Sequence, residues 1–147
     1  LPYGPSVISG DHGSSNNLLI SAVSEVDQEP SVFYSYPEGG WGALDEKDGE
    51  NALFSIVGNC KNMPAEALEL TLPMRLLRYE LRQDTGGAGR RRGGLGTRRD
   101  YEILANSASL SFVSDRCIYG ANGLAGGREG GVGWALRGIR GGTGPPS

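Results

Sequence analysis

Short apolar runs with the composition of β-strands dominate the hydrophobic pattern of this chain. Leu18 to Val23 is a continuous run, and Val32 to Tyr36 is rich in β-branched and aromatic residues. Such residues fit a pleated, half-buried surface, so both runs predict strands. Ala52 to Val57 is a third candidate strand in the first part of the chain.

A different pattern predicts one helix between Asn62 and Leu70. Asn62 is a residue type that caps helices, Pro64 is tolerated in a first turn, and Glu66 suits the positive end of the helix dipole. Pro73 cannot continue the helix. We therefore expect a helix of about two turns.

Residues 74–82 fit two templates. Leu77, Tyr79 and Leu81 alternate with charged residues, which favours a strand, although Met74, Leu77 and Leu81 also share one helix face. We predict a strand here.

The second half predicts further strands. Arg98 to Leu104 and Ser109 to Val113 are expected to form an antiparallel pair, and residues 132–136 alternate enough for one last short strand. Because helices and strands do not alternate, the pattern argues against a parallel α/β fold. We predict a mostly β fold in a single module, residues 1–147, with residues 140–147 as a frayed or docked tail.

The densest glycine stretch runs from Asp84 to Gly96, with six glycines and three arginines among its thirteen residues. Glycine at this density is unfavourable in a helix or strand. Either the backbone takes positive φ at several positions, or it runs extended, polyproline-II-like, where only a hydrogen atom fits. Residues 120–144 are similarly rich, with eleven glycines.

The charge is strongly asymmetric, although its sum is only −3. Residues 1–74 carry eleven acids and two lysines, whereas residues 75–147 carry twelve arginines and six acids. Either the two halves attract each other within one fold, or the basic half faces an anionic ligand or partner.

Composition also bears on location. Two cysteines and no secretory leader favour a reducing, cytoplasmic compartment, and no apolar run approaches the roughly 18 residues that cross a membrane. Because the chain begins with Leu1, we expect it to be processed or to be a piece of a longer chain.

Common nucleotide and nucleic-acid motifs do not match. A P-loop needs Gly-Lys-Ser/Thr, but the lysines are Lys47 and Lys61, and dinucleotide spacing of glycines occurs nowhere. Arg92-Gly93-Gly94 resembles an RNA-coating element but occurs once, without a nearby aromatic residue. We therefore expect no nucleic-acid partner and no cofactor bound by this chain.

Catalytic and metal-binding groups are sparse. His12 and Asp11 are neighbours, while zinc needs three or four protein ligands. We expect no complete metal site here, although His12 could add one ligand to a site completed by another chain. Asp84 either anchors a cation or substrate group, or accepts hydrogen bonds from the amides that follow it.

Four segments carry a resemblance to a known family. Residues 79–96, with Asp84-Thr85-Gly86-Gly87-Ala88-Gly89-Arg90-Arg91-Arg92-Gly93-Gly94-Leu95-Gly96, resemble the signature of the hydantoinase B/oxoprolinase family. The family usually has serine at Thr85 and an aromatic residue at Arg91. Residues 39–49, 62–69 and 115–127 match in the same order. The motif positions, expected to be structural or interface residues, are Gly39, Gly40, Gly42, Asp48, Gly49, Asn62, Pro64, Glu66, Glu69, Asp84, Gly86, Gly87, Gly89, Arg90, Arg92, Gly93, Gly94, Gly96, Arg116, Gly126 and Gly127.

The resemblance covers only the C-terminal part of the family's usual length, so no catalytic residue is carried over. It implies antiparallel sheets in a barrel-like or sandwich arrangement running into glycine-rich extended segments. It further implies a C-terminal module, or split small subunit, of an enzyme that opens cyclic amides after ATP-dependent activation. Ketone carboxylation is the alternative, and a non-catalytic assembly role is a third.

The same resemblance implies partners. These are the N-terminal portion of the B component and an ATP-binding A-type subunit in a hetero-oligomer, with ATP, Mg and a Zn or Mn ion held by the partner subunits.

Three consecutive arginines, Arg90, Arg91 and Arg92, cannot all point the same way in an extended chain. Since the family has an aromatic residue at Arg91, we predict that Arg91 is exposed. Arg90 and Arg92 are predicted to be structural, paired with acids of the first half such as Asp45 and Asp48.

Overall fold

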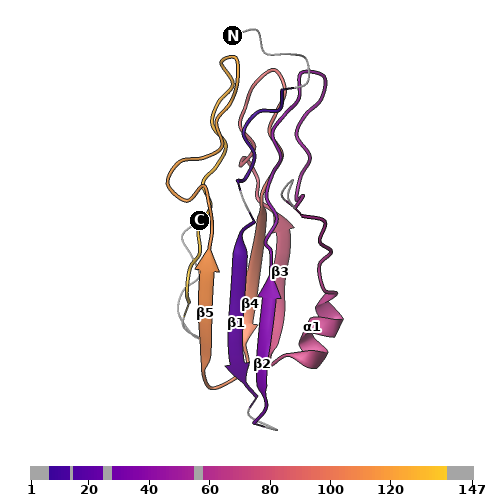
Figure 1. The fold of residues 1–147 in the computed structure, drawn as a ribbon, viewed down its shortest axis with the longest axis vertical. Coiled ribbons are helices and arrows are strands. Elements are labelled where there is room, and N and C mark those ends of the chain that lie inside the picture. The colour runs from indigo at the N-terminus through magenta and orange to yellow at the C-terminus, as the bar shows by residue number, and fades with distance from the viewer. Residues whose placement is uncertain (1–6, 14, 25–27, 55–57, 139–147) are drawn as a thin grey trace.

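The structure is a computed structural model that describes residues 7–13, 15–24, 28–54 and 58–138. Two antiparallel sheets face each other, and long extended loops continue beyond one end of them (Figure 1). The elements within the described ranges are β1 (Asn17–Val23), β2 (Pro30–Ser35), α1 (Ala65–Thr71), β3 (Met74–Leu81), β4 (Thr97–Ile103) and β5 (Ala108–Val113). The prediction of a mostly β fold with one short helix is confirmed, in a sandwich-like form rather than a closed barrel.

The first sheet has the order β2-β1-β5, with β1 antiparallel to both neighbours. Alternate residues of β1 point inward, and Leu18 and Ile20 are buried. Ile20 lies opposite Phe33 of β2 and opposite Leu110 of β5, so these three side chains share the inner face.

The second sheet is the β3-β4 hairpin, with a register shift between Leu76 and Arg78. Its inner face carries Met74 and Tyr101, while its outer face carries ion pairs such as Arg75–Glu102. The buried core between the sheets consists of Leu18, Ile20, Phe33, Leu68 and Met74. Burial of each of these large side chains contributes about 1.5–3 kcal/mol to stability.

The helix α1 adds one side chain to this core. Leu68 is buried, whereas the rest of the helix faces outward beside β3 (Figure 1). Pro64 occupies the N-cap position and no side chain caps the helix. The expectation that Asn62 caps it was therefore wrong, because the Asn62 amide bonds to other side chains.

Extended segments from four parts of the chain form a bundle beyond the sheets, which we call the glycine bundle: residues 9–13, 39–53, 85–96 and 120–133. Backbone hydrogen bonds connect them, including His12 N–H to Gly40 O at 3.1 Å and Gly94 N–H to Trp41 O at 2.8 Å. Arg128 N–H donates to Ala88 O at 2.7 Å, which ties in the last segment. The buried backbone groups are thus paired outside any helix or sheet.

Glycine is required in this bundle because backbones touch. A Cβ on Gly40 would lie 1.9 Å from Gly94 O, and one on Gly94 would lie 1.9 Å from Glu50 O. At Gly87 it would lie 2.3 Å from Arg128 O, whereas at Gly93 the nearest atom is 3.2 Å away. Within residues 85–96 no glycine has a positive φ. Of the two sequence-based possibilities, the structure therefore supports close-packed extended backbone.

Three strand predictions differ from the structure. Residues 52–54 form only a single bridge, Leu53 to Gly39, because Ala52 has φ 51° and bends the chain; residues 55–57 lie outside the described residues. β4 pairs with β3 and β5 pairs with β1, so the predicted β4–β5 pair was wrong. Separation into two sheets lets Tyr101 and Phe112 both face the core. Residues 132–136 are extended but not in a strand.

Replacing Gly94 with alanine is expected to destabilise the protein by about 1–3 kcal/mol, because the new Cβ would overlap a backbone oxygen that no side-chain rotation can move. Gly138→Ala is the matched control, since a Cβ there meets no atom of the described residues within 4 Å. Urea unfolding of both variants measures the difference. Equal midpoints for the two variants would contradict close packing.

Candidate functional site

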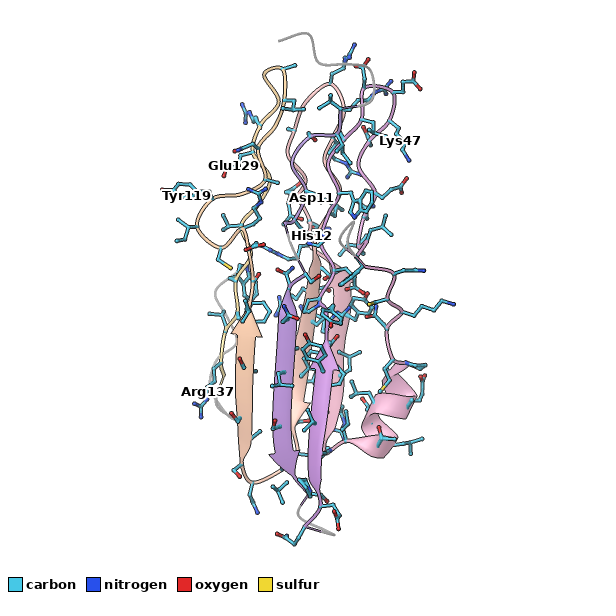
Figure 2. All side chains as sticks on the ribbon, viewed as in Figure 1. Asp11, His12, Lys47, Tyr119, Glu129 and Arg137 are labelled. Atoms are coloured by element: carbon cyan, nitrogen blue, oxygen red, sulfur yellow. The ribbon has the colours of Figure 1, made fainter. Side chains whose placement is uncertain are left out.

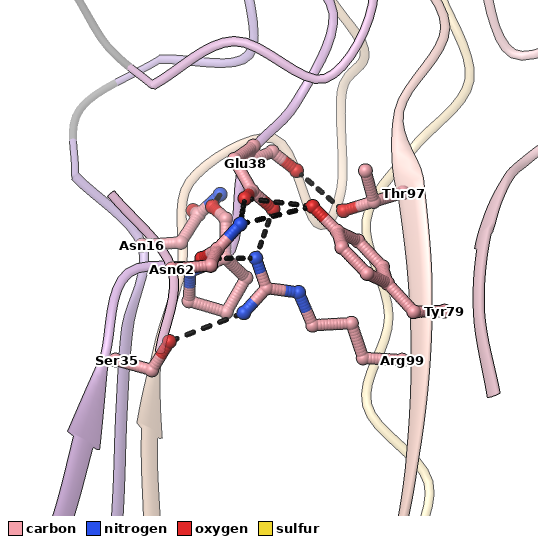
Figure 3. A network of polar contacts seen from close by, with 8 residues as sticks. Asn16, Ser35, Glu38, Asn62, Tyr79, Thr97 and Arg99 are labelled. Atoms are coloured by element: carbon pink, nitrogen blue, oxygen red, sulfur yellow. Dashed lines mark hydrogen bonds and ion pairs between the residues drawn. The ribbon is translucent and has the colours of Figure 1, made fainter. Parts of the chain in front are cut away.

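A buried ion pair stands where the two sheets meet the glycine bundle. Arg99, on the inner face of β4, bonds to Glu38, which follows β2, and both side chains are only 8% exposed (Figure 3). Arg99 reaches this position because β4 alternates inward residues Thr97, Arg99, Tyr101 and Ile103.

Neighbouring side chains complete a polar network around the pair. Arg99 also donates to Ser35 Oγ at 3.1 Å and to Asn62 Oδ1 at 2.9 Å. Tyr79 Oη donates to Glu38 Oε1 at 2.9 Å, and the Asn62 amide donates to the same oxygen. The Arg99 guanidinium also lies over the Tyr79 ring, 4.7 Å from its centroid. Residues from separate segments of the chain therefore converge on one carboxylate.

The network keeps Glu38 ionised. Burial by itself would raise the pKa of Glu38, but the hydrogen bond from Asn62, the charge of Arg99 and the bond from Tyr79 together hold it below its ordinary value. The pKa of Tyr79 is raised, first by burial and then by its bond to the Glu38 carboxylate, so the phenol stays protonated as a donor.

Such a buried pair fixes the relative position of the segments that carry it more than it adds to the net stability. Desolvation of two charges offsets much of their attraction, but removal of one partner leaves the other buried and unpaired. The Arg99 Nε is already buried without a hydrogen-bond partner in the described ranges. The network therefore makes the relative position of β2, β4 and residue 62 specific.

His12 lies in the bundle near this network (Figure 2). Its Cβ would be 2.2 Å from a Cβ on Gly39, and both ring nitrogens are buried without a hydrogen-bond partner among the residues that the structure describes. Burial lowers the pKa of His12, against the opposing influence of Asp11, the Leu53 carbonyl, Glu38 and Asp115. The imidazole is therefore neutral at neutral pH. That His12 adds one ligand to a shared metal site stays a prediction.

The structure corrects the prediction for the three arginines. Arg90 pairs with Asp45, one of the expected partners, but its side chain is 81% exposed. Arg91 Nε donates to Asp45 O at 3.4 Å, and Arg92 contributes its backbone N–H, 2.9 Å from Asp48 Oδ1. All three side chains are exposed. The inward role fails because the acids that these arginines meet, Asp45 and Asp48, are themselves exposed, so the contacts form at the surface.

Most motif positions meet in the glycine bundle. Gly39, Gly40, Gly42, Gly49, Gly86, Gly87 and Gly94 each have a neighbouring atom within 2.3 Å of where a Cβ would stand. Asp48 bonds to the Arg92 amide, and Gly49 N–H donates to Arg92 O at 2.8 Å. Gly89, Gly93 and Gly96 lie in the same segment with more space.

Other motif positions lie apart. Glu66 is in the first turn of α1, and Glu69 Oε1 accepts from Leu76 N–H at 3.1 Å. Asp84 has φ 57° in the turn after β3. Its two alternative uses, to anchor a cation or substrate group or to accept hydrogen bonds from the amides that follow it, stay predictions. Arg116 has φ 56° and Gly126 has φ 87°, while Gly127 N–H donates to Leu124 O at 2.9 Å.

Sequence reasoning missed Glu38, Arg99, Tyr79 and Ser35. One signal for Arg99 was present: an arginine occupies an inward position of an alternating strand, where an unpaired charge is costly. Nothing in the sequence identified Glu38 as its partner, because the two residues are 61 positions apart.

Among the described residues, no group of three or more His, Cys, Asp or Glu side chains is placed to hold a metal ion. Over the same residues, no helix is long and apolar enough to cross a membrane.

Replacing Arg99 with methionine is expected to destabilise the protein by about 3–5 kcal/mol, because Glu38 would be left buried and unpaired. The double replacement Arg99→Met with Glu38→Leu should recover much of this loss, since no charge then remains unpaired. Chemical denaturation of both variants tests the expectation. A double variant less stable than Arg99→Met alone would contradict it.

The pH dependence follows from the lowered pKa of Glu38. Because its folded-state pKa lies below the ordinary 4.5, its contribution is fully present above pH 4.5 and is lost as the pH falls through the folded value. As the pH falls below 4.5, we expect the free energy of unfolding to decrease less for Glu38→Gln than for the natural chain. Glu46→Gln, at an exposed position, is the control and should follow the natural chain.

Comparison with known proteins places the chain in context. The family model described as Hydantoinase B/oxoprolinase matches residues 3–144. The B component of a candidate D-/L-hydantoinase of Pseudomonas sp. is 32% identical over 82% of this chain and 20% of its own length. The 5-oxoprolinase 1 of Arabidopsis thaliana is 31% identical over 67% of this chain and 8% of its own.

A solved structure agrees with both. A chain of nucleotide-free acetone carboxylase, from work on ATP-dependent acetone carboxylation, superposes with a TM-score of 0.73 and 26% identity over 86% of this chain. This chain spans 17% of that one, and about a fifth or less of the curated relatives named above. The match covers the glycine bundle and the motif positions that build it, and the chain belongs to the hydantoinase B/oxoprolinase family.

Proposed function

We propose that this chain is the C-terminal module, or a separately encoded small subunit, of the B component of an ATP-dependent enzyme that opens cyclic amides. Its role is to scaffold that component and form an interface within a hetero-oligomer. The proposed partners are the N-terminal portion of the B component and an ATP-binding A-type subunit, in the cytoplasm.

One observation carries this proposal: the family match runs from residue 3 to residue 144, through every segment of the glycine bundle. At several glycines of the bundle the backbones lie too close to admit a side chain, and the buried Arg99–Glu38 pair connects the bundle to the sheets. This geometry suits a rigid support for a neighbouring part.

No catalytic step is assigned to this chain. The described residues do not offer a group that fits a metal ion, and His12 contributes only one imidazole. We therefore place ATP, magnesium and any zinc or manganese ion on the partner subunits.

Ketone carboxylation is the second candidate, and the similarity to the acetone carboxylase chain favours it. The third, a non-catalytic assembly protein that retains only the family shape, would use the same scaffold without any enzyme. The residues that would distinguish these substrates are not among the motif positions of this chain.

The test is reconstitution. The 147-residue chain is co-expressed with the Pseudomonas B component deprived of its matching fifth and with an A-type subunit. We expect ATP-dependent opening of hydantoin or 5-oxoproline, at least about tenfold faster with this chain than without it. The chain by itself should show no ATP hydrolysis.

Other outcomes separate the candidates. Consumption of acetone and bicarbonate with ATP, without amide opening, would establish the carboxylase alternative. An assembled complex whose activity is the same with and without this chain would leave only the assembly role. ATP hydrolysis by the purified chain would contradict the scaffold assignment.

A further inference from the structure

The two sheets are unequal, and the difference leaves part of the inner face open. Three strands form the first sheet and two form the second. Figure 1 shows β3 and β4 behind β1 and β2, while β5 stands to one side. Phe33, Ile20 and Leu110 lie side by side on the inner face of the first sheet. The second sheet covers the first two, which are 7% and 3% exposed, whereas Leu110 is 62% exposed.

A groove lies at this open part, between β4 and β5. It is one end of a larger cavity of about 1060 Å³ that continues along the segments of the glycine bundle, so that volume is not the volume of the groove alone. We name it the β4–β5 groove and define it by Tyr101 of β4, Leu110 and Phe112 of β5, Trp134, Arg82 and Arg116. Its apolar floor continues the core, since Phe112 packs against the buried cluster.

One wall of the groove is an unpaired strand edge. β4 pairs with β3 on one side, and among the described residues no strand pairs with its other side. A free edge presents a row of N–H and C=O groups that can accept another strand. Both sheets are open. A strand that paired with this edge of β4 would therefore extend the second sheet over Leu110.

Two cations in the groove lack a carboxylate partner among the residues that the structure describes. Arg82 donates to Val132 O at 3.0 Å and lies 5.3 Å from the Trp134 ring centroid, and it forms no ion pair with a described residue. The Arg116 Nε is buried and has no hydrogen-bond partner within the described part of the chain. Burial lowers the pKa of Arg82, because desolvation disfavours its charged form.

We propose that the β4–β5 groove receives an extended strand from the rest of a hydantoinase B-type polypeptide. This strand pairs with the free edge of β4, lays apolar side chains on Leu110 and Phe112, and places a carboxylate against Arg82 and Arg116. The inference rests on the proposed function for the identity of the partner. It is favoured over a second copy because the Pseudomonas relative has about five times the matched length, and because a second copy would add its own uncompensated arginines.

The probe is the Pseudomonas B component without its matching fifth, bound to the full 147-residue chain in the absence of ATP and substrate. Leu110→Lys should weaken the apparent Kd by about tenfold or more, because a charge would enter the apolar floor. Ser109→Lys is the matched control: it is the adjacent residue on the opposite face of β5, and it should bind like the natural chain.

Hydrogen exchange distinguishes strand pairing from side-on contact. Alternate amides of β4, those directed away from β3, should exchange rapidly in the free chain and slowly in the complex. Arg82→Gln should reduce the salt dependence of binding, since one ion pair is removed. Unchanged β4 exchange in a formed complex would overturn the strand-pairing proposal.

The remaining outcomes separate this proposal from the proposed function. Equal binding by Leu110→Lys and Ser109→Lys, or no binding by the natural chain, overturns the groove assignment whatever the reconstituted activity. Dimers of the isolated chain that Leu110→Lys abolishes also overturn it, in favour of a second copy. Normal binding with no ATP-dependent activity supports the groove and counts against the enzymatic role.

Discussion

At Gly40 and Gly94 two extended segments lie so close that a carbonyl oxygen occupies the position of a Cβ. The rest of the structure depends on this approach. It places residues 39–49 against residues 86–94, where Trp41 and Arg92 supply backbone oxygens and Asp48 supplies a carboxylate. Hydrogen bonds between backbones then replace those of a helix or sheet, so the bundle is ordered without regular secondary structure.

The Arg99–Glu38 pair connects this bundle to the sheets. Glu38 immediately precedes the close-packed Gly39 and Gly40, and Arg99 lies in β4 shortly after the glycine stretch ends. Because both charges are desolvated and multiply bonded, displacement of either segment would expose an unpaired charge to an apolar interior. The pair therefore aligns the sheets with the bundle, together with hydrogen bonds such as Thr97 Oγ1 to Glu38 O at 2.8 Å.

The sandwich is complete on one side and open on the other. Over β1 and β2 the hairpin β3-β4 and the helix residue Leu68 cover the inner face, whereas over β5 the same face reaches solvent. Within the described part of the chain, the apolar row ends at Leu110, beside a free strand edge and arginines without carboxylate partners. A free strand edge and an exposed apolar row are typical of surfaces that contact another polypeptide, and the chain covers only a small share of each relative named above.

Several features of the fold and site were accessible from the sequence. Period-two alternation and β-branched runs located β1, β2, β3, β4 and β5 nearly to their bounds, since such runs have one buried and one exposed face. Glycine density at residues 86–96 indicated backbone contact, because only glycine lacks a Cβ. The likeness of those residues to a family signature indicated the family. Of the polar network around Arg99 and Glu38, the sequence had singled out only Asn62, as a motif position.

Strand partners and the buried charges were decided by the tertiary structure. β4 and β5 adjoin in sequence but lie in different sheets, because pairing them would have left the apolar face of β1 uncovered. Arg90 and Arg92 were expected inside and Arg99 was not considered, since local sequence does not reveal which arginine faces a carboxylate 61 residues away. The sequence by itself determined which segments are extended and where backbones must touch, since both follow from local side-chain chemistry. Only the tertiary structure decided which segments meet, because that choice depends on which distant faces and charges can be buried together.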